Sequence, residues 1–309
     1  MSITPADFRF RRHSPLPARR FASLLAIVCL PVLAGGASAA EPVVPAGVEF
    51  NRDLEFSNPG NQHLQLNLAL PKAEGGLRPA VICIHGGGFR QGRRENYDGV
   101  CLELASRGYV AATITYRLAP DHPFPAAVED CKAAVRWLRA HAAEYRVDPE
   151  RIAAWGGSAG ANLALLLGTT AGVKQFERGP NLEQSSAVAC VVSFSGPSDL
   201  TRSYGSSVDA GVVLPLYFGG DLSAKRREHI IGSPLYWVTP EAAPILAIHG
   251  TADPYVAYEQ SFWIVDRLLA AGVEAGLLTI EEAGHGFKGA DAKRALETAI
   301  VFLDQKMKK

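Results

Sequence analysis

The sequence predicts an α/β protein in which one mostly parallel sheet is covered by helices on both faces. The main observation is an alternation of apolar, strand-like runs with helical stretches. Such near-continuous apolar strands are typical of a parallel sheet that is buried on both sides. No linker or internal repeat divides the chain after its leader, so one domain over residues 40–309 is expected. The expected strands are residues 80–85, 109–117, 151–156, 187–195, 244–249 and 275–281.

Two runs that precede this alternation predict an antiparallel pair of strands at one edge of the sheet. Residues 47–57 and 63–70 are the expected strands, and the turn residues 58–61 (Asn-Pro-Gly-Asn) separate them. Among the covering helices, residues 126–141 give the clearest pattern. Their small and apolar side chains recur at helical spacing, at Ala127, Cys131, Ala134, Val135 and Leu138.

Residues 197–243 are longer than one crossover between strands needs. The segment contains several aromatic side chains, which serve equally well in a small lid and in packing a segment against the body. Both interpretations are kept for this insertion. The aromatic residues concerned are Tyr204, Tyr217, Phe218, Tyr236 and Trp237.

Residues 1–39 have the pattern of a secretory signal peptide. A basic region with five arginines precedes the apolar stretch 21–34, and Ala37-Ser38-Ala39 forms an A-x-A cleavage site. The apolar stretch is too short for a membrane span, and Pro31 interrupts it. The pair Arg19-Arg20 keeps the twin-arginine route open beside general secretion. We therefore expect export to a bacterial periplasm or beyond.

Charge and cysteine content narrow the set of partners. Without the leader, 31 basic residues lose five arginines and 31 acidic residues lose Asp7, which leaves 26 and 30 and a net charge of −4. This balance gives no reason to expect nucleic acid or anionic lipid as a partner.

For the four cysteines after the leader, buried free thiols are favoured over a disulfide bridge, although export would permit a bridge. No spacing resembles a zinc site, so no metal or cofactor is expected. The remaining cysteines are Cys83, Cys101, Cys131 and Cys190.

The pentapeptide Gly156-Gly157-Ser158-Ala159-Gly160 lies between an apolar strand and a helical stretch. A serine at the tip of such a strand–turn–helix stands clear of the backbone, and small flanking residues let strand and helix approach closely. The helix N-terminus below the serine favours developing negative charge. The pattern therefore predicts a nucleophilic Ser158.

Three further motifs accompany this serine. His85-Gly86-Gly87-Gly88-Phe89 ends an apolar run and supplies glycine amides that are able to point at an oxyanion. Asp253 follows the expected strand 244–249, and His285 follows the strand 275–281. The chain order Ser158, Asp253, His285 is that of an α/β-hydrolase and differs from the order in other serine hydrolase folds.

Together with the segment 116–120 (Tyr-Arg-Leu-Ala-Pro), these motifs resemble the hormone-sensitive-lipase-type esterases of the α/β-hydrolase fold. The resemblance is strongest to the bacterial branch related to feruloyl and acetyl carbohydrate esterases, and it spans residues 48–306. Gly157 stands where lipase-like relatives usually carry an acidic residue, and Ala161 stands where a second glycine is common. The long helical N-terminal cap of the lipase-like enzymes is also not seen before the first strands.

The residues and the resemblance assign the following roles. Ser158 attacks an ester carbonyl, His285 acts as base, and Asp253 fixes the tautomer of His285. The resemblance implies that the amides of Gly87, Gly88 and Ala159 hold the oxyanion. Structural interpretations stay open: Ser158 in an inactive turn, and Asp253 as the cap of a helix that begins near Pro254. His85 and His249 are expected to be structural.

A carboxylic-ester hydrolase is the expected function. Acetyl or feruloyl esters of carbohydrates and general short-chain esters are about equally favoured as substrates, because a fold does not fix its substrate. A prolyl-oligopeptidase-type peptidase shares the core fold but normally carries a large additional domain. A non-catalytic binding module would lack the nucleophile or the histidine, and this chain has both.

Overall fold

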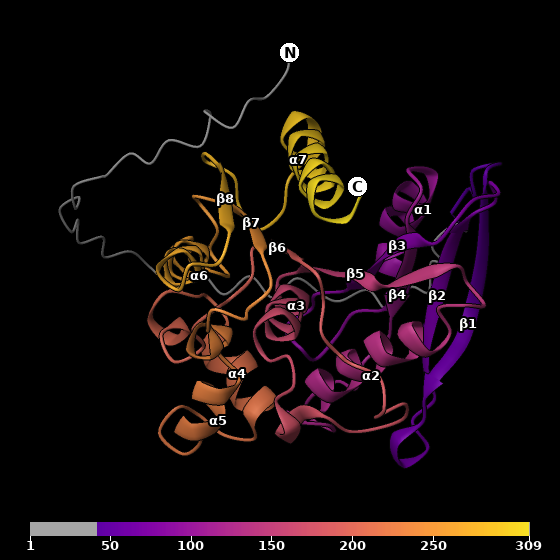
Figure 1. Ribbon diagram of the computed structural model, residues 1–309. Helices are drawn as coiled ribbons and strands as arrows, with labels where there is room; N and C mark the ends of the chain where they lie inside the picture. The colour runs from indigo at the N-terminus through magenta and orange to yellow at the C-terminus, as the bar shows by residue number, and fades with distance from the viewer. Residues whose placement is uncertain (1–41, 309) are drawn as a thin grey trace, which may run out of the picture. The chain divides into compact units, whose positions relative to one another are not determined.

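The computed structural model describes residues 42–308, in which eight strands form one sheet in the order β1-β2-β4-β3-β5-β6-β7-β8 (Figure 1). β1 pairs antiparallel with β2, β2 pairs antiparallel with β4, and all other neighbours are parallel. The predicted fold class, with its antiparallel edge pair, is thus confirmed. The strands are β1 (Val48–Ser57), β2 (Leu64–Pro71), β3 (Arg78–Ile84), β4 (Val110–Ile114), β5 (Val147–Gly157), β6 (Val191–Phe194), β7 (Ile245–Gly250) and β8 (Ala275–Ile280).

Helices cover both faces of this sheet. On one face, α2, α3 and α6 bury apolar side chains such as Leu138, Leu166 and Ile264. On the other face, α1 and α7 bury Leu104 and Leu303. These two groups of helices lie on opposite sides of the strands in Figure 1. The helices are α1 (Asp98–Ser106), α2 (Ala126–Ala140), α3 (Ala159–Thr169), α4 (Ala210–Phe218), α5 (Arg226–Ile231), α6 (Glu259–Ala270) and α7 (Gly289–Met307).

Two strands are shorter than the sequence predicts. β4 ends at Ile114 instead of residue 117, because Arg117 turns toward α2, where its backbone amide donates to Asp130 Oδ2 at 2.8 Å. β6 begins at Val191 instead of residue 187, where the Ala187 carbonyl accepts a hydrogen bond from the Arg139 side chain of α2. Contacts between side chains and the backbone thus end these strands before their apolar runs end.

The parallel strands bring their carboxyl ends to one edge of the sheet. Ile84 of β3 pairs with Gly156 of β5, Gly157 of β5 pairs with Phe194 of β6, and Gly250 of β7 pairs with Ile280 of β8. The strand order reverses direction at β3, which lies between β4 and β5. Ligands of open α/β sheets bind at the carboxyl ends of the strands, next to such a reversal.

The segment 197–243 forms α4, α5 and two short 3₁₀ turns, Ser203–Gly205 and Pro234–Trp237. All five of its aromatic residues take part in packing or internal hydrogen bonds. Tyr217 stacks on Phe89 with ring centroids 3.8 Å apart, and the Tyr204 hydroxyl lies 2.7 Å from His229 Nε2. Phe218 is buried, and the Trp237 indole donates to the Ile231 carbonyl at 2.8 Å. Tyr236 is half exposed, and its hydroxyl donates to Asp199 Oδ2 at 3.1 Å. The segment therefore braces the loop that follows β3.

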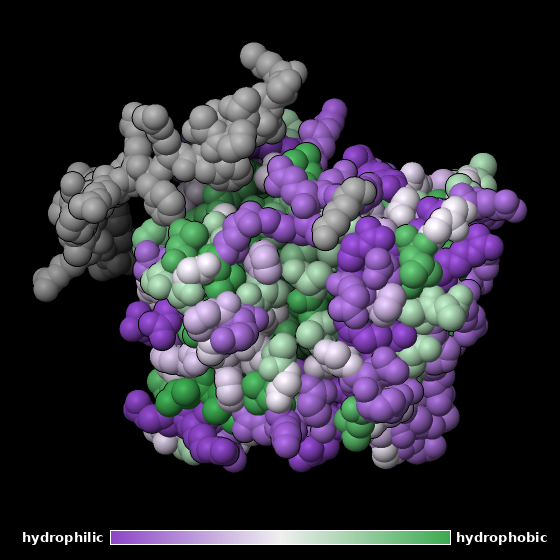
Figure 2. Space-filling model, in the orientation of Figure 1, coloured by the Kyte–Doolittle hydropathy of each residue, from purple (hydrophilic) through white to green (hydrophobic). Residues whose placement is uncertain are grey.

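The four cysteines after the leader are buried and free. Cys83 lies in β3, Cys101 in α1 and Cys131 in α2, and Cys190 directly precedes β6. The predicted signal peptide, residues 1–39, falls outside the described part of the chain. Across residues 42–308, no helix combines the length and the apolar character that a bilayer crossing requires. On the face seen in Figure 2, apolar residues gather toward the middle, with polar residues around them.

Candidate active site

Ser158 stands at a sharp turn between β5 and α3. Its φ of 55° lies in the left-handed region, which a residue with a side chain rarely adopts. The Ser158 amide donates to the Phe194 carbonyl at 2.8 Å, and its carbonyl accepts from the Ala161 amide at 2.9 Å. A Cβ on Gly160 would collide with the carbonyl oxygen of Ile84. The turn is thus held by backbone on three sides and leaves only the side chain of Ser158 free to point outward.

The glycine loop after β3 runs beside this turn. A Cβ on Gly86 would stand 2.8 Å from the Gly157 carbonyl oxygen. Gly87 and Gly88 have φ values of 119° and 60°, which glycine adopts without strain. Neither their amides nor the amide of Ala159 donates a hydrogen bond within the described residues. These three N–H groups are therefore free, and the loop that carries two of them packs through Gly86 against the turn at Ser158.

His85 holds the glycine loop in place through contacts with Gly86 and Tyr116. Its ring stacks on Tyr116 with centroids 4.3 Å apart, and its Nδ1 lies 2.8 Å from the Gly86 carbonyl oxygen. The Tyr116 hydroxyl donates to the His85 carbonyl at 2.9 Å. Burial lowers the pKa of His85, which favours the neutral ring. These contacts give His85 a structural part, in line with the expectation from sequence.

On the opposite side of the serine, Asp253 and His285 are joined directly. His285 Nδ1 lies 2.7 Å from Asp253 Oδ2. The other carboxylate oxygen, Oδ1, accepts from the amides of Tyr255 at 2.9 Å and Val256 at 3.0 Å. Asp253 therefore caps the turn that it begins and also holds the histidine, each with a different oxygen. The helix that the sequence predicts near Pro254 is not formed, since α6 begins only at Glu259, so Asp253 caps a turn and not a helix. This cap leaves Oδ2 free to hold His285.

The electrostatics of Asp253 favour the charged carboxylate. Burial by itself would raise the pKa of Asp253, whose side chain is fully buried. The hydrogen bonds from His249, His285 and the Val256 amide outweigh this effect, so the pKa lies well below its usual range. Asp253 thus presents a negative charge to the ring of His285, which is itself 22% exposed.

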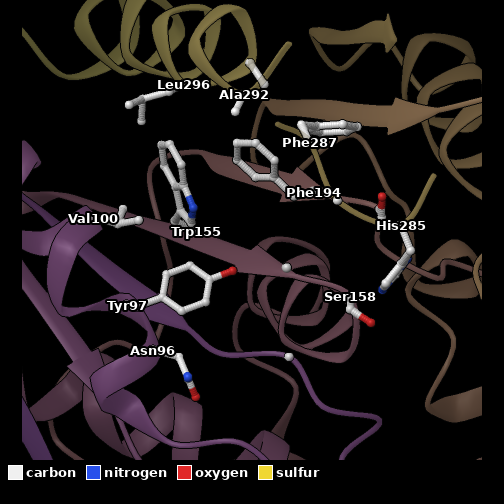
Figure 3. Close-up of a pocket in the computed structure, with 15 residues that line it drawn as sticks. Asn96, Tyr97, Val100, Trp155, Ser158, Phe194, His285, Phe287, Ala292 and Leu296 are labelled. Atoms are coloured by element: carbon white, nitrogen blue, oxygen red, sulfur yellow. The ribbon is translucent and has the colours of Figure 1, made fainter. Parts of the chain in front are cut away.

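Ser158 and His285 lie next to each other at the mouth of a pocket (Figure 3). The described residues offer no hydrogen-bond partner to Ser158 Oγ in this structure. Hydrogen bonds between nucleophile and base are often long in free enzymes and tighten when substrate binds. The structure therefore brings Ser158 and His285 to one pocket and joins His285 to Asp253, and it packs Gly86 of the glycine loop against the turn at Ser158.

The pocket beside Ser158 has a volume of about 470 Å³ and mostly apolar walls. Trp155, Phe194 and Leu296 form its deep part, and Phe287 lies near His285 (Figure 3). Burial raises the pKa of the Tyr97 phenol, so its hydroxyl stays protonated. The lining residues are Gly86, Asn96, Tyr97, Val100, Trp155, Gly157, Ser158, Phe194, Ser195, His285, Gly286, Phe287, Ala292, Ala295 and Leu296.

Tyr97 is a site residue that the sequence analysis missed. It ends a short 3₁₀ turn, Arg94–Tyr97, and its hydroxyl points toward the backbone of Gly157 (Figure 3). A Cβ at position 157 would collide with this hydroxyl but would lie 3.8 Å from Tyr97 Cζ. The absence of a side chain at Gly157, noted in the sequence, was the signal: it makes room for a phenol.

No metal centre accompanies these groups. Over residues 42–308, no group of three or more His, Cys, Asp or Glu side chains is arranged to hold a metal ion.

Comparisons with known proteins identify the family of the chain. The BD-FAE family model matches residues 66–268, a span that includes the glycine loop, Ser158 and Asp253. Esterase LipC of Mycobacterium tuberculosis is 33% identical over 255 residues, which cover 74% of this chain and 58% of the relative. The chain thus spans little more than half of that curated protein.

Two solved esterase structures resemble the chain over most of its length. A truncated form of a carbohydrate esterase from gut microbiota superimposes with a TM-score of 0.75 at 25% identity, covering 84% of this chain and 97% of the other. Esterase Est2 of Thermogutta terrifontis gives a TM-score of 0.70 at 28% identity, covering 84% of this chain and 92% of the other.

Proposed function

The chain belongs to the BD-FAE family, and we propose that it is a serine carboxylic-ester hydrolase that works through Ser158, His285 and Asp253. One observation carries the proposal. Ser158, on its strained turn, lies beside a histidine whose other ring nitrogen is 2.7 Å from a buried carboxylate. A nucleophile, a base and a group that orients the base are the three parts that acyl transfer through serine requires.

In the first half of the reaction, Ser158 Oγ attacks the ester carbonyl carbon while His285 Nε2 takes the hydroxyl proton. Asp253 keeps the proton of His285 on Nδ1, so that Nε2 is free to accept, and it stabilises the imidazolium that forms. Collapse of the tetrahedral intermediate breaks the bond to the alcohol, and His285 gives its proton to the leaving oxygen. The product is an acyl-enzyme on Ser158.

In the second half, water attacks the acyl-enzyme and His285 again acts first as base and then as acid. In both halves, negative charge develops on the carbonyl oxygen of the substrate. The amides of Gly87, Gly88 and Ala159 are the proposed donors to this oxygen, since all three are free and Gly86 packs the glycine loop against the turn of Ser158. Loss of one such donor typically costs about 2.7 to 4 kcal/mol of transition-state stabilisation.

We propose short acyl or feruloyl esters of carbohydrates as the substrates. The pocket beside Ser158 has the apolar, partly aromatic walls that an acyl group needs, and its volume falls within the range of about 300 to 1,000 Å³ usual for ligand sites. Tyr255 is half exposed, and the centroid of its ring lies 5.3 Å from that of His285. In the proposed mechanism His285 protonates the leaving alcohol, so Tyr255 lies near the alcohol part of the substrate. An exposed aromatic face is a suitable platform for a sugar ring. The neighbour named a carbohydrate esterase supports the same choice.

General short-chain carboxylesterase activity is the second candidate. The apolar walls of the pocket favour it, because they bind an acyl chain without any recognition of the alcohol.

The test is to incubate the purified protein with acetylated, feruloylated arabinoxylan and to measure released acetate and ferulate. p-Nitrophenyl acetate serves as the activity control and Ser158→Ala as the blank. Release that vanishes in Ser158→Ala supports a carbohydrate esterase and identifies its acyl group. Cleavage of the small ester alone selects the second candidate, and cleavage of neither refutes the catalytic proposal. Cleavage of peptide substrates instead would indicate a peptidase.

We also propose that the protein is exported, on the strength of the signal-peptide pattern in residues 1–39. Mass spectrometry of the N-terminus after expression in a bacterial host tests this proposal. A mature chain that begins after Ala39 supports it, and a chain that retains residues 1–39 contradicts it.

A further inference from the structure

A second histidine reaches the carboxylate of Asp253 from behind. His249 lies in β7, four residues before Asp253, and its side chain is fully buried. Its Nε2 lies 3.2 Å from Asp253 Oδ2 and 2.9 Å from the Val256 carbonyl oxygen. Its Nδ1 lies 2.7 Å from the Ser261 hydroxyl of α6. One imidazole thus touches both ends of the turn that carries the acid.

The partners of His249 determine its protonation. Asp253 Oδ2 and the Val256 carbonyl oxygen are acceptors only, so Nε2 must carry a proton. The Ser261 hydroxyl has no other acceptor within the described residues, so it donates to Nδ1, which must then be unprotonated. The neutral ring with its proton on Nε2 donates to the Val256 carbonyl oxygen at 2.9 Å, and the same N–H group lies beside Asp253 Oδ2, with the nitrogen 3.2 Å away. The contact between His249 and Asp253 is therefore that of a neutral N–H group with a carboxylate.

The carboxylate is surrounded by donors as a result. Oδ1 receives two backbone amides, and Oδ2 faces the N–H groups of both His285 and His249. The Val256 amide and the Val256 carbonyl point to Asp253 and to His249 respectively, which closes the turn on itself. Contacts within the protein therefore fix both the orientation of the carboxylate and the path of the turn.

We propose that His249 is a positioning residue of the active site: its Nε2–H group clamps the turn 253–256 and orients the Asp253 carboxylate toward His285. The inference rests on the proposed function, in which Asp253 orients the catalytic base. It changes the part that the sequence predicts for His249, from a loop contact to the support of the triad acid. His249 itself does not reach the substrate.

The surroundings of the pair supply few other titratable groups. Tyr258 packs edge-on against His249 with ring centroids 5.9 Å apart, and its hydroxyl lies 2.7 Å from Thr279 Oγ1. Tyr255 packs against His285. A change of the pH profile after substitution of His249 would therefore report on the Asp253–His285 pair.

The experiment compares His249→Met, which keeps the bulk but removes the N–H group, with His249→Gln, whose amide nitrogen is able to donate near the position of Nε2. For His249→Met, we expect kcat on p-nitrophenyl acetate to fall roughly tenfold, the size expected for one lost hydrogen bond to a charged group, with little change in KM. We also expect the acid limb of kcat/KM to move to higher pH, because a less stabilised carboxylate holds the imidazolium form of His285 more strongly. His249→Gln should recover most of kcat.

Tyr109→Phe is the matched control for lost stability. The substitution removes the hydrogen bond of 2.6 Å that the Tyr109 hydroxyl donates to Asp304. Tyr109 directly precedes β4, at the opposite end of the strands from Ser158. A purely structural His249 predicts that His249→Met lowers the melting temperature but leaves kcat and the acid limb equal to those of Tyr109→Phe. That outcome would overturn the inference.

A second measurement does not depend on activity. In protein labelled with ¹⁵N-histidine, the neutral ring of His249 should carry its proton on Nε2, with Nδ1 unprotonated. A protonated Nδ1 on His249 would refute the assignment. If instead Ser158→Ala retains esterase activity, the proposed function fails while the tautomer of His249 is still determined, so the two failures are distinguishable.

Discussion

The two sides of the proposed site are held in place by different kinds of force. On the side of Ser158, the backbones of β3, β5 and α3 approach so closely that Gly86 and Gly160 have no room for a side chain. On the side of His285, four N–H groups converge on the carboxylate of Asp253. The nucleophile is therefore placed by steric exclusion, and the acid by hydrogen bonds. Substitutions on the first side should act through packing, and substitutions on the second side through charge and orientation.

The largest loss of activity is expected from substitution of Ser158 or His285, the two residues at which the two sides meet. Ser158→Ala removes the nucleophile, and kcat for p-nitrophenyl acetate should fall roughly a millionfold. His285→Ala should cost a similar factor, and the double variant should be no worse than either single one, because the two residues act as a unit. Steady-state kinetics of the three variants, with circular dichroism as the check on folding, tests this. Additive losses would contradict the proposed pair.

The next largest effect is expected from Asp253→Asn. The amide would leave His285 without its acceptor and favour the wrong tautomer, so kcat should fall about 10⁴-fold. Asp253→Glu is the matched control, since it keeps the charge but moves it. If Asp253→Asn retains more than about a tenth of the activity, then Asp253 is only the cap of its turn.

The same substitution makes a prediction about stability and pH. The pKa of Asp253 is lowered in the folded protein, so the carboxylate contributes stability above its unfolded pKa of about 3.9, and this contribution is lost as the pH falls. Thermal unfolding of the wild-type protein and of Asp253→Asn should therefore differ most at neutral pH. The difference should shrink as the pH is lowered from about 5 toward 3. A constant difference across this range would contradict the assigned direction.

On the side of Ser158, Gly160→Ala tests steric exclusion. Its Cβ would collide with the carbonyl oxygens of Ile84 and His85, which belong to backbone and cannot rotate away. We expect a loss of about 3 kcal/mol in the free energy of unfolding, or roughly 6 to 12 °C in melting temperature. Gly99→Ala in α1 is the control, because its Cβ meets open space and should add about 0.5 kcal/mol. Equal effects of the two substitutions would refute the argument.

Much of this arrangement could be predicted from the sequence, because it depends on local patterns. Apolar runs and their order predict the strands, and the GGSAG pattern predicts a turn that only small neighbours permit. The contacts of Tyr97 and His249 depend on packing between elements. Tyr97 has no motif of its own, and its importance shows only when the chain brings it beside Gly157. The four-residue spacing of His249 and Asp253 is visible in the sequence, but the shared carboxylate oxygen is a property of the fold.

The smallest predicted effect concerns the contact between Gly157, which directly precedes Ser158, and Tyr97 in the pocket wall. In Gly157→Ala the new methyl group collides with the Tyr97 hydroxyl, and kcat/KM for p-nitrophenyl butyrate should fall about fivefold. Tyr97→Phe alone should change kcat/KM by less than about twofold, since the hydroxyl has no hydrogen-bond partner within the described residues. Because a Cβ at position 157 would lie 3.8 Å from Cζ of residue 97, the double variant has room for both side chains. It should recover nearly all of the loss, which corresponds to a coupling energy of about 1 kcal/mol in the double-mutant cycle. A double variant as impaired as Gly157→Ala would show that the loss arises from the strained turn at Ser158, and steric exclusion there would then not extend to the pocket wall.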